Sequence, residues 1–371
     1  PELNGCVRVQ VRTYGCQMNV LDSEIISGLL RARGFTLTDR ESEADAILFN
    51  TCSVRDLSER KVIGKLGMLH RGRARRPELV LGVLGCMAEL AGARLLERQP
   101  YIDFVCGTNN RQHVPDLLLE ALRHRVAGAA QTRYNAADLE RLRGALQLDD
   151  GPPSPSWQPP VAVGLDARST VDERIARRPQ PWRAFVEIVR GCSNFCSYCV
   201  VPYARGPEVS RAPDDILAEI TQLANAGCVE ITLLGQNVNS YGKDLTGGSA
   251  LFPELLRQIN GIEGVRWIRF VTSNPHDISP AMIEAIADCE RVCRQMHFPL
   301  QAGADRILAR MRRRYTCADY HAKIAALRAA VPSMVFSSDF IVGFPGETDA
   351  EFAETCAALT QIGFASAFIF K

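Results

Sequence analysis

A tight group of three cysteines constrains this chain more than any other feature. Cys192, Cys196 and Cys199 form a CxxxCxxC spacing directly after an apolar, strand-like run at residues 182–189. Thiolates so spaced select zinc or an iron–sulfur cluster, and a structural zinc site needs a fourth protein ligand nearby. The next histidine along the chain is His276. The simplest interpretation is therefore a four-iron cluster in which the protein holds three irons and the last stays open to bind a substrate or cofactor.

Length and composition limit the remaining possibilities. With 371 residues, 46% of them hydrophobic, the chain can bury the cores of two or more domains. It has no run of about eighteen apolar residues and no charged-then-apolar N-terminal segment, so we expect a cytoplasmic protein without a membrane anchor. Thirteen cysteines in a reducing compartment favour metal binding over disulfides.

The charge distribution gives only a weak indication of a nucleic-acid partner. The net charge of +1 provides no overall basic field. Two local clusters are cationic, at residues 71–76 and 310–314. Either could neutralise phosphates, but a solvated helix end explains each cluster equally well on its own.

Residues 1–127 predict a parallel, doubly wound α/β domain of the Rossmann-like kind. Val7, Val9 and Val11 alternate with polar residues as in a half-buried strand, and apolar strand-like runs follow at 44–50 and 79–84. Helix-compatible stretches separate these strands, as is typical of parallel sheets.

One cysteine follows each of these three strands: Cys16, Cys52 and Cys86. Residues just beyond the strands of a parallel sheet gather at its carboxyl edge, so the three thiols could converge on a second cluster. Gly15 and Gly85 would let the backbone turn sharply beside it. The alternative, three unrelated buried thiols, remains open on position alone.

Residues 128–180 are interpreted as a Pro-rich linker, because the stretch at 151–160 can form neither a helix nor a central strand. From 181 to 371, strand-like and helical segments alternate again. Strands are expected at 184–189, 230–234, 266–272, 296–299, 335–342 and 365–370, and helices near 214–226, 252–261, 280–288, 304–312, 318–331 and 349–361. This alternation predicts a (β/α)6 partial barrel with its active site in the loops after the strands, the first of which holds the CxxxCxxC motif.

The CxxxCxxC motif, with the aromatic Tyr198 before its last cysteine, resembles the radical S-adenosylmethionine superfamily. This resemblance implies that Cys192, Cys196 and Cys199 are catalytic ligands of a [4Fe–4S] cluster. S-adenosylmethionine would bind the open iron, and an electron from the cluster would cleave it.

The strings TYGCQMN, NTCSVR and GCMAE resemble the N-terminal domain of the methylthiotransferases. In that family the three matching cysteines hold an auxiliary [4Fe–4S] cluster. The resemblance therefore implies that Cys16, Cys52 and Cys86 hold a second cluster, and that this cluster carries the sulfur to be transferred.

Three further strings are most similar to the MiaB group of that family: LLGQNVNSY at 233–241, VVPYARGPEVSR at 200–211 and SSDFIVGFPGET at 337–348. This similarity implies a tRNA methylthiotransferase that converts N6-isopentenyladenosine at position 37 to its 2-methylthio derivative by radical C–H activation, sulfur insertion and methyl transfer. Alternatives are a methylthiotransferase acting on threonylcarbamoyladenosine in tRNA or on a ribosomal-protein aspartate. From another class, the alternative is a non-catalytic, zinc-bound RNA-binding module.

Other residues after the barrel strands complete the expected site. By resemblance, residues 235–237 would meet the methionine end of S-adenosylmethionine, and Ile341 and Gly343 would border its adenine. The expected cofactor contacts are Tyr198, Gly235, Gln236, Asn237, Ser273, Gln301, Ile341 and Gly343.

The same resemblance implies the binding partners. The sequence also departs from the family pattern at two places. We expect a monomer that binds the anticodon loop of tRNA and takes electrons from a donor such as flavodoxin or ferredoxin. HFPLQAGAD at 297–305 differs from the LPVQSGSD usual in the family. The chain also stops inside the expected sixth strand, where the family continues into an RNA-gripping β domain called TRAM.

Overall fold

The chain divides into two units. In the computed structural model, residues 3, 5–53, 56–131, 135–148, 152–165 and 172–371 are described. Val54 and Arg55 of the NTCSVR string, and Gly151 of the expected linker, lie outside the described residues. The first unit comprises Pro1–Arg178 together with Tyr203–Gly206, and the second comprises Pro179–Pro202 and Pro207–Lys371.

A six-stranded parallel sheet forms the centre of the first unit. Its strand order is β2 (Thr36–Leu37), β1 (Arg8–Tyr14), β3 (Ala46–Thr51), β4 (Val80–Gly85), β5 (Phe104–Cys106) and β6 (Val161–Ala162). The strands β1, β3 and β4 match the three expected from the sequence. The other strands are only two or three residues long, too short for hydrophobic alternation to reveal them.

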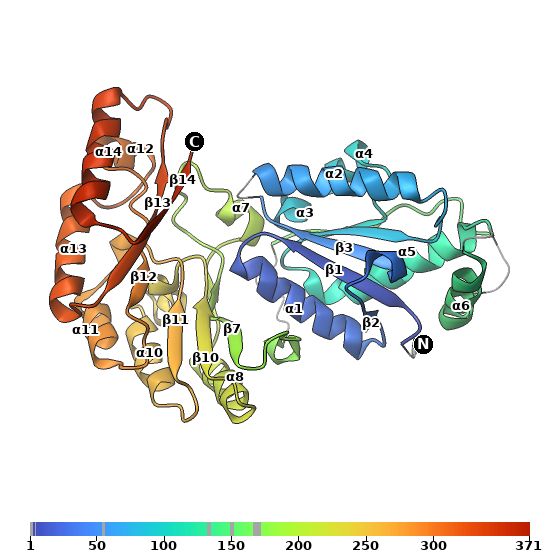
Figure 1. Cartoon of the computed structure of the whole chain (residues 1–371), viewed down its shortest axis with the longest axis horizontal. Coiled ribbons are helices and arrows are strands. Elements are labelled where there is room, and N and C mark those ends of the chain that lie inside the picture. The colour runs from blue at the N-terminus through green and yellow to red at the C-terminus, as the bar shows by residue number, and fades with distance from the viewer. Residues whose placement is uncertain (1–2, 4, 54–55, 132–134, 149–151, 166–171) are drawn as a thin grey trace. The chain divides into compact units, whose positions relative to one another are not determined.

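Helices cover both faces of this sheet, so every residue of β3 is buried. Along β3, Ala46 and Leu48 pack into one core and Ile47 and Phe49 into the other, as a strand buried on both faces requires. Figure 1 shows α1 and α2 on opposite sides of the sheet. The first core lies under α1 (Gln17–Ala32), α5 (Val114–Gly128) and α6 (Ala136–Leu146), and the second under α2 (Asp56–Gly72), α3 (Cys86–Ala91) and α4 (Ala93–Arg98).

Part of the stretch expected as a linker packs on the first unit. It contributes helix α6 and the edge strand β6. Trp157 stacks on His124 of α5, with ring centroids 3.9 Å apart. Residues that cannot enter a helix or central strand are therefore held against the unit by an aromatic contact instead.

The second unit is a part-barrel built from two three-stranded parallel sheets. The strands are β7 (Arg183–Glu187), β10 (Glu230–Leu234), β11 (Trp267–Phe270), β12 (Gln295–His297), β13 (Val335–Ile341) and β14 (Ser366–Phe370). A parallel bridge between Ile268 and Val292 joins β11 to the segment before β12. A short antiparallel pair, β8 (Val189–Arg190) and β9 (Val209–Ser210), is added after β7.

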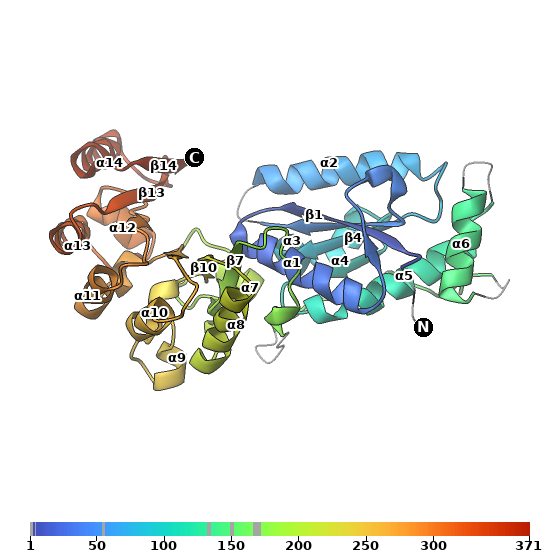
Figure 2. The same ribbon diagram turned by 60° about the horizontal axis from the view of Figure 1, so that its bottom comes forward.

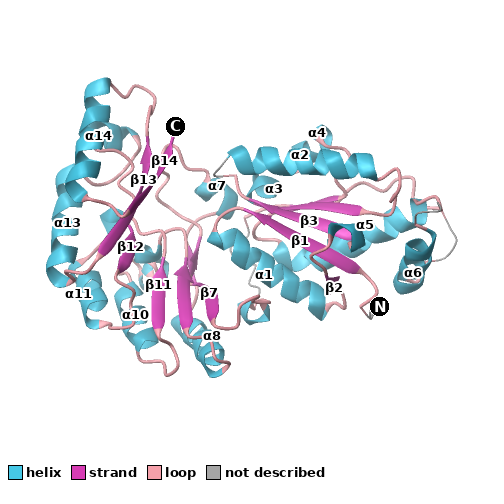
Figure 3. Cartoon of the chain, viewed as in Figure 1, coloured by secondary structure: helices cyan, strands magenta, loops and turns pink. Residues whose placement is uncertain are grey.

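Helices follow the strands of the second unit and lie outside them (Figures 2 and 3). They are α8 (Pro213–Asn225), α9 (Lys243–Thr246), α10 (Phe252–Asn260), α11 (Pro280–Asp288), α12 (Asp305–Arg310), α13 (Cys317–Ala330) and α14 (Asp349–Ile362). The short helix α7 (Val201–Arg205) comes before them in the chain, and its last three residues belong to the first unit. Proline in the first turn begins α8, α10 and α11, because proline has no amide hydrogen to leave unpaired there.

The remaining helical turns are short 3-10 segments. They are η1 (Glu41–Glu43), η2 (Arg111–His113), η3 (Glu173–Ile175), η4 (Val238–Ser240) and η5 (Pro275–Asp277). None of the helices in the described part of the chain has the length and apolar character of a membrane span.

Candidate functional site

The first triad of thiols consists of Cys16, Cys52 and Cys86. They follow β1, β3 and β4, which are neighbours in the sheet, so all three lie at its carboxyl edge. The thiol of Cys52 is within hydrogen-bonding reach of both other thiols. The structure thus brings together three cysteines that are far apart in the sequence.

Two glycines allow this close approach. A Cβ on Gly15 would lie 2.3 Å from Asn19 Oδ1 and 2.9 Å from Cys52 Cβ. Gly85 has φ +87°, and a Cβ there would lie 2.3 Å from Asn50 Oδ1. No other residue type fits beside the triad at these two positions without moving its neighbours.

The environment of the first triad favours thiolates. The contact with Cys52 lowers the pKa of Cys16 to about 5 and the pKa of Cys86 to about 7, and the positive charge of Arg205 contributes to both shifts. The same contacts with Cys16 and Cys86 raise the pKa of Cys52. Because a metal binds thiolates and releases their protons, this is a suitable starting state for ligands.

Arg205 is a residue that the sequence reasoning missed. Its side chain is 4% exposed, and it belongs to the first unit. Its Nη2 donates to Asp22 Oδ2 at 2.7 Å, while Arg111 pairs with the other oxygen of Asp22. Among the described residues, Arg205 Nη1 is buried without a hydrogen-bond partner. The sequence offers no signal for this role, because arginine is mostly an exposed residue.

The second triad, Cys192, Cys196 and Cys199, lies in the loop between β8 and α7. All three residues are half-buried, and the backbone amide of Cys199 donates to the carbonyl of Cys196 at 3.0 Å. Ser197 fixes the loop to the end of α12, since its amide donates to Met311 O at 3.1 Å and its hydroxyl to Arg310 O at 2.9 Å.

Burial and one guanidinium dominate the electrostatics of the second triad. Burial raises the pKa of Cys192, and raises the pKa of Cys199 to about 11. Arg313 Nη1 donates to Cys196 Sγ at 3.3 Å, and Arg313 Nε donates to Tyr315 Oη at 3.0 Å. Arg313 therefore belongs to the thiol site, not to a phosphate-binding surface as the cationic cluster at 310–314 suggested.

Two arginines of the cationic cluster at 71–76 are likewise bound to groups of the protein. Arg73 is buried, forms an ion pair with Asp103 and donates to backbone oxygens. Arg76 donates to the backbone oxygens of Glu41 and Ala44. These two arginines support the fold of the first unit, so they are not available to bind phosphates.

The expected cofactor contacts lie at the carboxyl edge of the second unit. Gln236 accepts a hydrogen bond from the amide of Gly191, while its Nε2 is buried and unpartnered among the described residues. Asn237 Nδ2 donates to Asp277 Oδ2 at 2.6 Å. Ser273 is 3% exposed, and its hydroxyl also has no partner in the part of the chain that the structure describes.

The other expected contacts flank this group. A Cβ on Gly235 would lie 2.4 Å from Val189 Cγ1, so glycine is required there. Gln301 is buried and its carbonyl accepts from the amide of Ile341 at 2.9 Å. Tyr198 is half-buried against the core, and the amide of Gly343 donates to Glu347 Oε2 at 2.6 Å.

Strained backbone gathers at this edge as well. Among the described non-glycine residues, five have a positive φ, and four of these are Phe195, Thr272, Gln301 and Arg312. Phe195 lies in the loop of the second triad, and Thr272 and Gln301 follow β11 and β12. Such conformations persist where the surrounding structure fixes them, and they are frequent at functional sites.

His297, the last residue of β12, was also missed. His297 Nδ1 contacts Ser337 Oγ at 3.0 Å, and Nε2 contacts Asp339 Oδ2 at 3.1 Å. His297 begins the HFPLQAGAD string, which departs from the usual family pattern.

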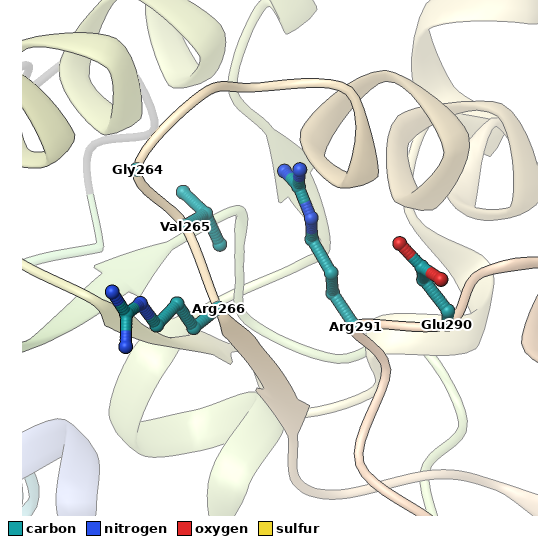
Figure 4. A pocket seen from close by; sticks show the side chains of 5 residues that line it. All are labelled: Gly264, Val265, Arg266, Glu290 and Arg291. Atoms are coloured by element: carbon teal, nitrogen blue, oxygen red, sulfur yellow. The ribbon is translucent and has the colours of Figure 1, made fainter.

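The hollow of about 500 Å³ in Figure 4 lies at the other end of the strands. It is lined by Gly264, Val265 and Arg266 before β11, and by Glu290 and Arg291 before β12. Active sites of (β/α) barrels lie at the carboxyl ends of the strands. This hollow is therefore not part of the candidate site.

The residues present fit the groups that the resemblance implies. No three His, Cys, Asp or Glu side chains in the described residues are arranged around a single metal ion. A [4Fe–4S] cluster spreads its ligands over different irons, so the single-ion arrangement is not the one it needs. The unpartnered Arg205 Nη1 beside the first triad suits an anionic cluster, and the unpartnered Gln236 Nε2 and Ser273 hydroxyl suit the polar groups of S-adenosylmethionine.

Two family models match the sequence. Residues 8–107 match the model described as uncharacterized protein family UPF0004. Residues 186–359 match the radical SAM superfamily, where SAM is S-adenosylmethionine. The matched ranges contain the first and the second triad, respectively.

Solved structures share the fold at low sequence identity. A radical S-adenosylmethionine methyltransferase, TsrM, from Kitasatospora setae has a TM-score of 0.65 at 14% identity, covering 98% of this chain and 72% of that one. The cobalamin-dependent S-adenosylmethionine radical enzyme OxsB has a TM-score of 0.61 at 12% identity, covering 95% of this chain and 51% of that one.

Curated relatives are much closer in sequence. The tRNA-2-methylthio-N(6)-dimethylallyladenosine synthase of Protochlamydia amoebophila (strain UWE25) is 45% identical over 361 residues, which cover 97% of this chain and 73% of that protein. The synthase of the same name from Thermoanaerobacter pseudethanolicus is 41% identical over 362 residues, covering 97% of this chain and 70% of that protein. This chain therefore belongs to the family of the tRNA-2-methylthio-N(6)-dimethylallyladenosine synthases, within the radical SAM superfamily.

Proposed function

We propose that this chain is a radical SAM methylthiotransferase that converts N6-isopentenyladenosine at position 37 of tRNA to its 2-methylthio derivative. The observation that carries the proposal is the meeting of Cys16, Cys52 and Cys86 at the carboxyl edge of a parallel sheet, in a chain that also holds the CxxxCxxC loop after β8 and is 45% identical to a synthase of that name. Two triads match a reaction that needs both a radical source and a sulfur donor.

The chain's own residues bind and orient the groups that react. When bound, two [4Fe–4S] clusters and S-adenosylmethionine supply the radical, the sulfur and the methyl group. The first triad would hold the auxiliary cluster and the second triad the cluster that meets S-adenosylmethionine. Gln236 and Ser273 would donate to the polar groups of S-adenosylmethionine through their unpartnered atoms. Buried side chains around them would keep water away from the radical.

The position of the second triad bears on how the nucleic acid is held. The target adenine has to leave the base stack of the anticodon loop to reach a barrel mouth. Arg310, Arg312 and Arg314 are exposed near the loop of the second triad, which Ser197 fixes to Met311 and Arg310. We assign these three arginines to the phosphates of the tRNA.

The proposed function also bears on the cellular location, the oligomeric state and the electron donor. A cytoplasmic location suits a tRNA substrate, and a reducing compartment keeps thirteen cysteines free for metal. We propose a monomer that takes electrons from a small donor such as flavodoxin or ferredoxin.

Mass spectrometry of tRNA nucleosides tests the proposed function. In a strain lacking the gene, isopentenyladenosine should lose its methylthio group and regain it when the gene returns. Unchanged isopentenyladenosine with loss of methylthio from threonylcarbamoyladenosine, or from a ribosomal-protein aspartate, would move the assignment to another methylthiotransferase group. Unchanged products of all three kinds would reject methylthio transfer.

A further inference from the structure

Each cysteine triad has one guanidinium of its own. Arg205 lies beside the first triad, where its charge acts on Cys16 and Cys86. Arg313 lies beside the second triad, with Nη1 3.3 Å from Cys196 Sγ. Neither arginine is needed to complete the set of three thiolate ligands, so each requires a separate explanation.

The charge around Arg205 calls for an anion. Asp22 accepts from Arg111 on one oxygen and from Arg205 on the other, and the side chains of all three are at most 4% exposed. Asp22 therefore shares its negative charge between two guanidinium groups. Because a buried charge is costly unless it is paired, the Arg205 guanidinium favours further negative charge at its side. The thiolates of the first triad provide that charge.

The free donor of Arg205 supports the same conclusion. Its Nη1 is buried and has no hydrogen-bond partner among the described residues. A buried donor of a charged group that is left unsatisfied destabilises the fold. A sulfur of a bound cluster would satisfy that donor, and none of the described protein atoms does so.

Arg313 has different contacts from Arg205, but it also places a positive charge beside a cysteine triad. Its polar contacts in the structure are Cys196 Sγ and Tyr315 Oη, and its guanidinium lies 5.0 Å from the centroid of the Tyr315 ring. Neither polar contact is a carboxylate. The charge of Arg313 is therefore available to the Cys196 sulfur, which the N–H group reaches directly.

We propose that Arg205 and Arg313 are positioning residues, each of which donates to sulfur in its own cluster and raises the reduction potential of that cluster alone. Hydrogen bonds to sulfur and the local net charge are two properties by which a protein sets such potentials. A more positive surrounding stabilises the more negative, reduced state of a cluster. The inference rests on the proposed clusters but not on the identity of the tRNA nucleoside.

The experiment measures the midpoint potential of each cluster separately in the full chain. With all three cysteines of the second triad replaced by alanine, an anaerobic redox titration followed by EPR reports the first cluster. The reverse replacement reports the second cluster. Arg205→Gln should shift only the first cluster, and Arg313→Gln only the second, to a more negative potential.

Matched variants separate this role from support of the fold. Arg111→Gln removes a guanidinium from the same Asp22 pair, and Arg312→Gln removes one from the exposed neighbour of Arg313. Each should cause a clearly smaller shift than its counterpart. Arg205→Lys and Arg313→Lys keep the charge and should return the potential partway to the wild-type value.

The outcomes are distinct even when a variant binds iron poorly. Loss of the first cluster in Arg205→Gln, with a normal circular dichroism spectrum, rescue by Arg205→Lys and normal loading of Arg111→Gln, would support the proposal. Unchanged potentials at full iron content would overturn it, and so would equal shifts or equal iron loss in each variant and its control. An inactive wild-type protein with both clusters and shifted variant potentials would reject the tRNA reaction and leave this inference standing.

Discussion

At the scale of single residues, Cys52 explains why the first triad is prepared for metal. Its contacts favour a proton on Cys52 and thiolates at Cys16 and Cys86. Removing the proton from Cys52 would leave three neighbouring thiolates that repel one another. A cation that binds all three sulfurs replaces this proton and cancels the repulsion. The metal-free protein should therefore show one unusually acidic, exposed thiol.

The rate of alkylation of Cys16 in the metal-free protein tests whether its thiol is unusually acidic. Because its pKa lies at about 5, Cys16 is already a thiolate at pH 6, and its rate of reaction with iodoacetamide should change little between pH 6 and pH 8. An ordinary thiol, with a pKa of about 8.5, gains about tenfold per pH unit over that range. Peptide mapping measures the rate of alkylation at Cys16 at both pH values. A tenfold rise per unit at Cys16 would contradict the assignment.

The glycine beside the triad gives a second residue-scale test. Gly85→Ala places a Cβ at φ +87° and 2.8 Å from the Thr51 carbonyl oxygen. The backbone strain alone costs about 1–2 kcal/mol, before any clash. Urea unfolding should show at least that loss, with reduced iron in the first cluster. Gly64→Ala, at an exposed helical position with nothing near its Cβ, should instead stabilise the protein by about 0.5–1 kcal/mol.

The positions of the six cysteines in segments that follow strands could be predicted from the sequence, whereas the contacts of Arg205 and Arg313 could not. The cysteines occur in a short motif and directly after predicted strands, and both patterns can be recognised in the amino-acid sequence. Arg205 and Arg313 owe their burial to contacts with residues 183 and 117 positions away. Arg313 in addition lies between two other arginines, and such a run indicates an exposed charge cluster until the fold is known.

At the scale of helices and strands, local chemistry determined most boundaries of the second unit. The observed α8, α10, α11, α13 and α14 lie within a residue or two of the expected ranges. Capping boxes at Thr316 and Thr348 and the first-turn prolines explain this agreement. The pair β8–β9 was missed because its strands have two residues each and pair across the loop of the second triad.

The cap of α14 can be tested directly. Thr348 Oγ1 accepts from the amide of Glu351 at 3.4 Å, and replacing such a cap by alanine costs about 1 kcal/mol. Thr348→Ala should lower the free energy of unfolding by about that amount in urea. Thr360→Ala in the same helix removes only an exposed hydroxyl bonded to Cys356 O and should stay within about 0.5 kcal/mol of wild type. Equal effects of the two changes would rule out the capping role.

At the scale of the whole molecule, the two units could be expected from the sequence but their membership could not. Both parallel α/β architectures follow from alternating strands and helices. Tyr203–Gly206, however, belongs to the first unit although it follows the loop of the second triad in sequence. The hydroxyl of Thr108 donates to Ala204 O at 2.6 Å, and Arg205 binds Asp22. Such packing depends on contacts that no local pattern encodes.

Binding of tRNA tests the proposed role of the exposed arginines. Reversing Arg312 and Arg314 to glutamate, and leaving Arg313 intact, should weaken binding and reduce the slope of log K against log salt by about 2. Iron content should not change, because both side chains are exposed. Arg266→Glu, at the hollow of Figure 4 on the opposite end of the strands, is the control. If Arg266→Glu weakened tRNA binding equally, the arginines at 310–314 would not be part of the tRNA interface.

The most direct test of the account is an iron count on three forms of the full chain after anaerobic reconstitution. We predict about eight iron atoms per chain in the wild type, and about four when the cysteines of either triad are replaced by alanine. Mössbauer spectra should show [4Fe–4S] clusters in all three forms. Bound zinc in place of iron, or loss of all iron when only one triad is replaced, would contradict two independent clusters.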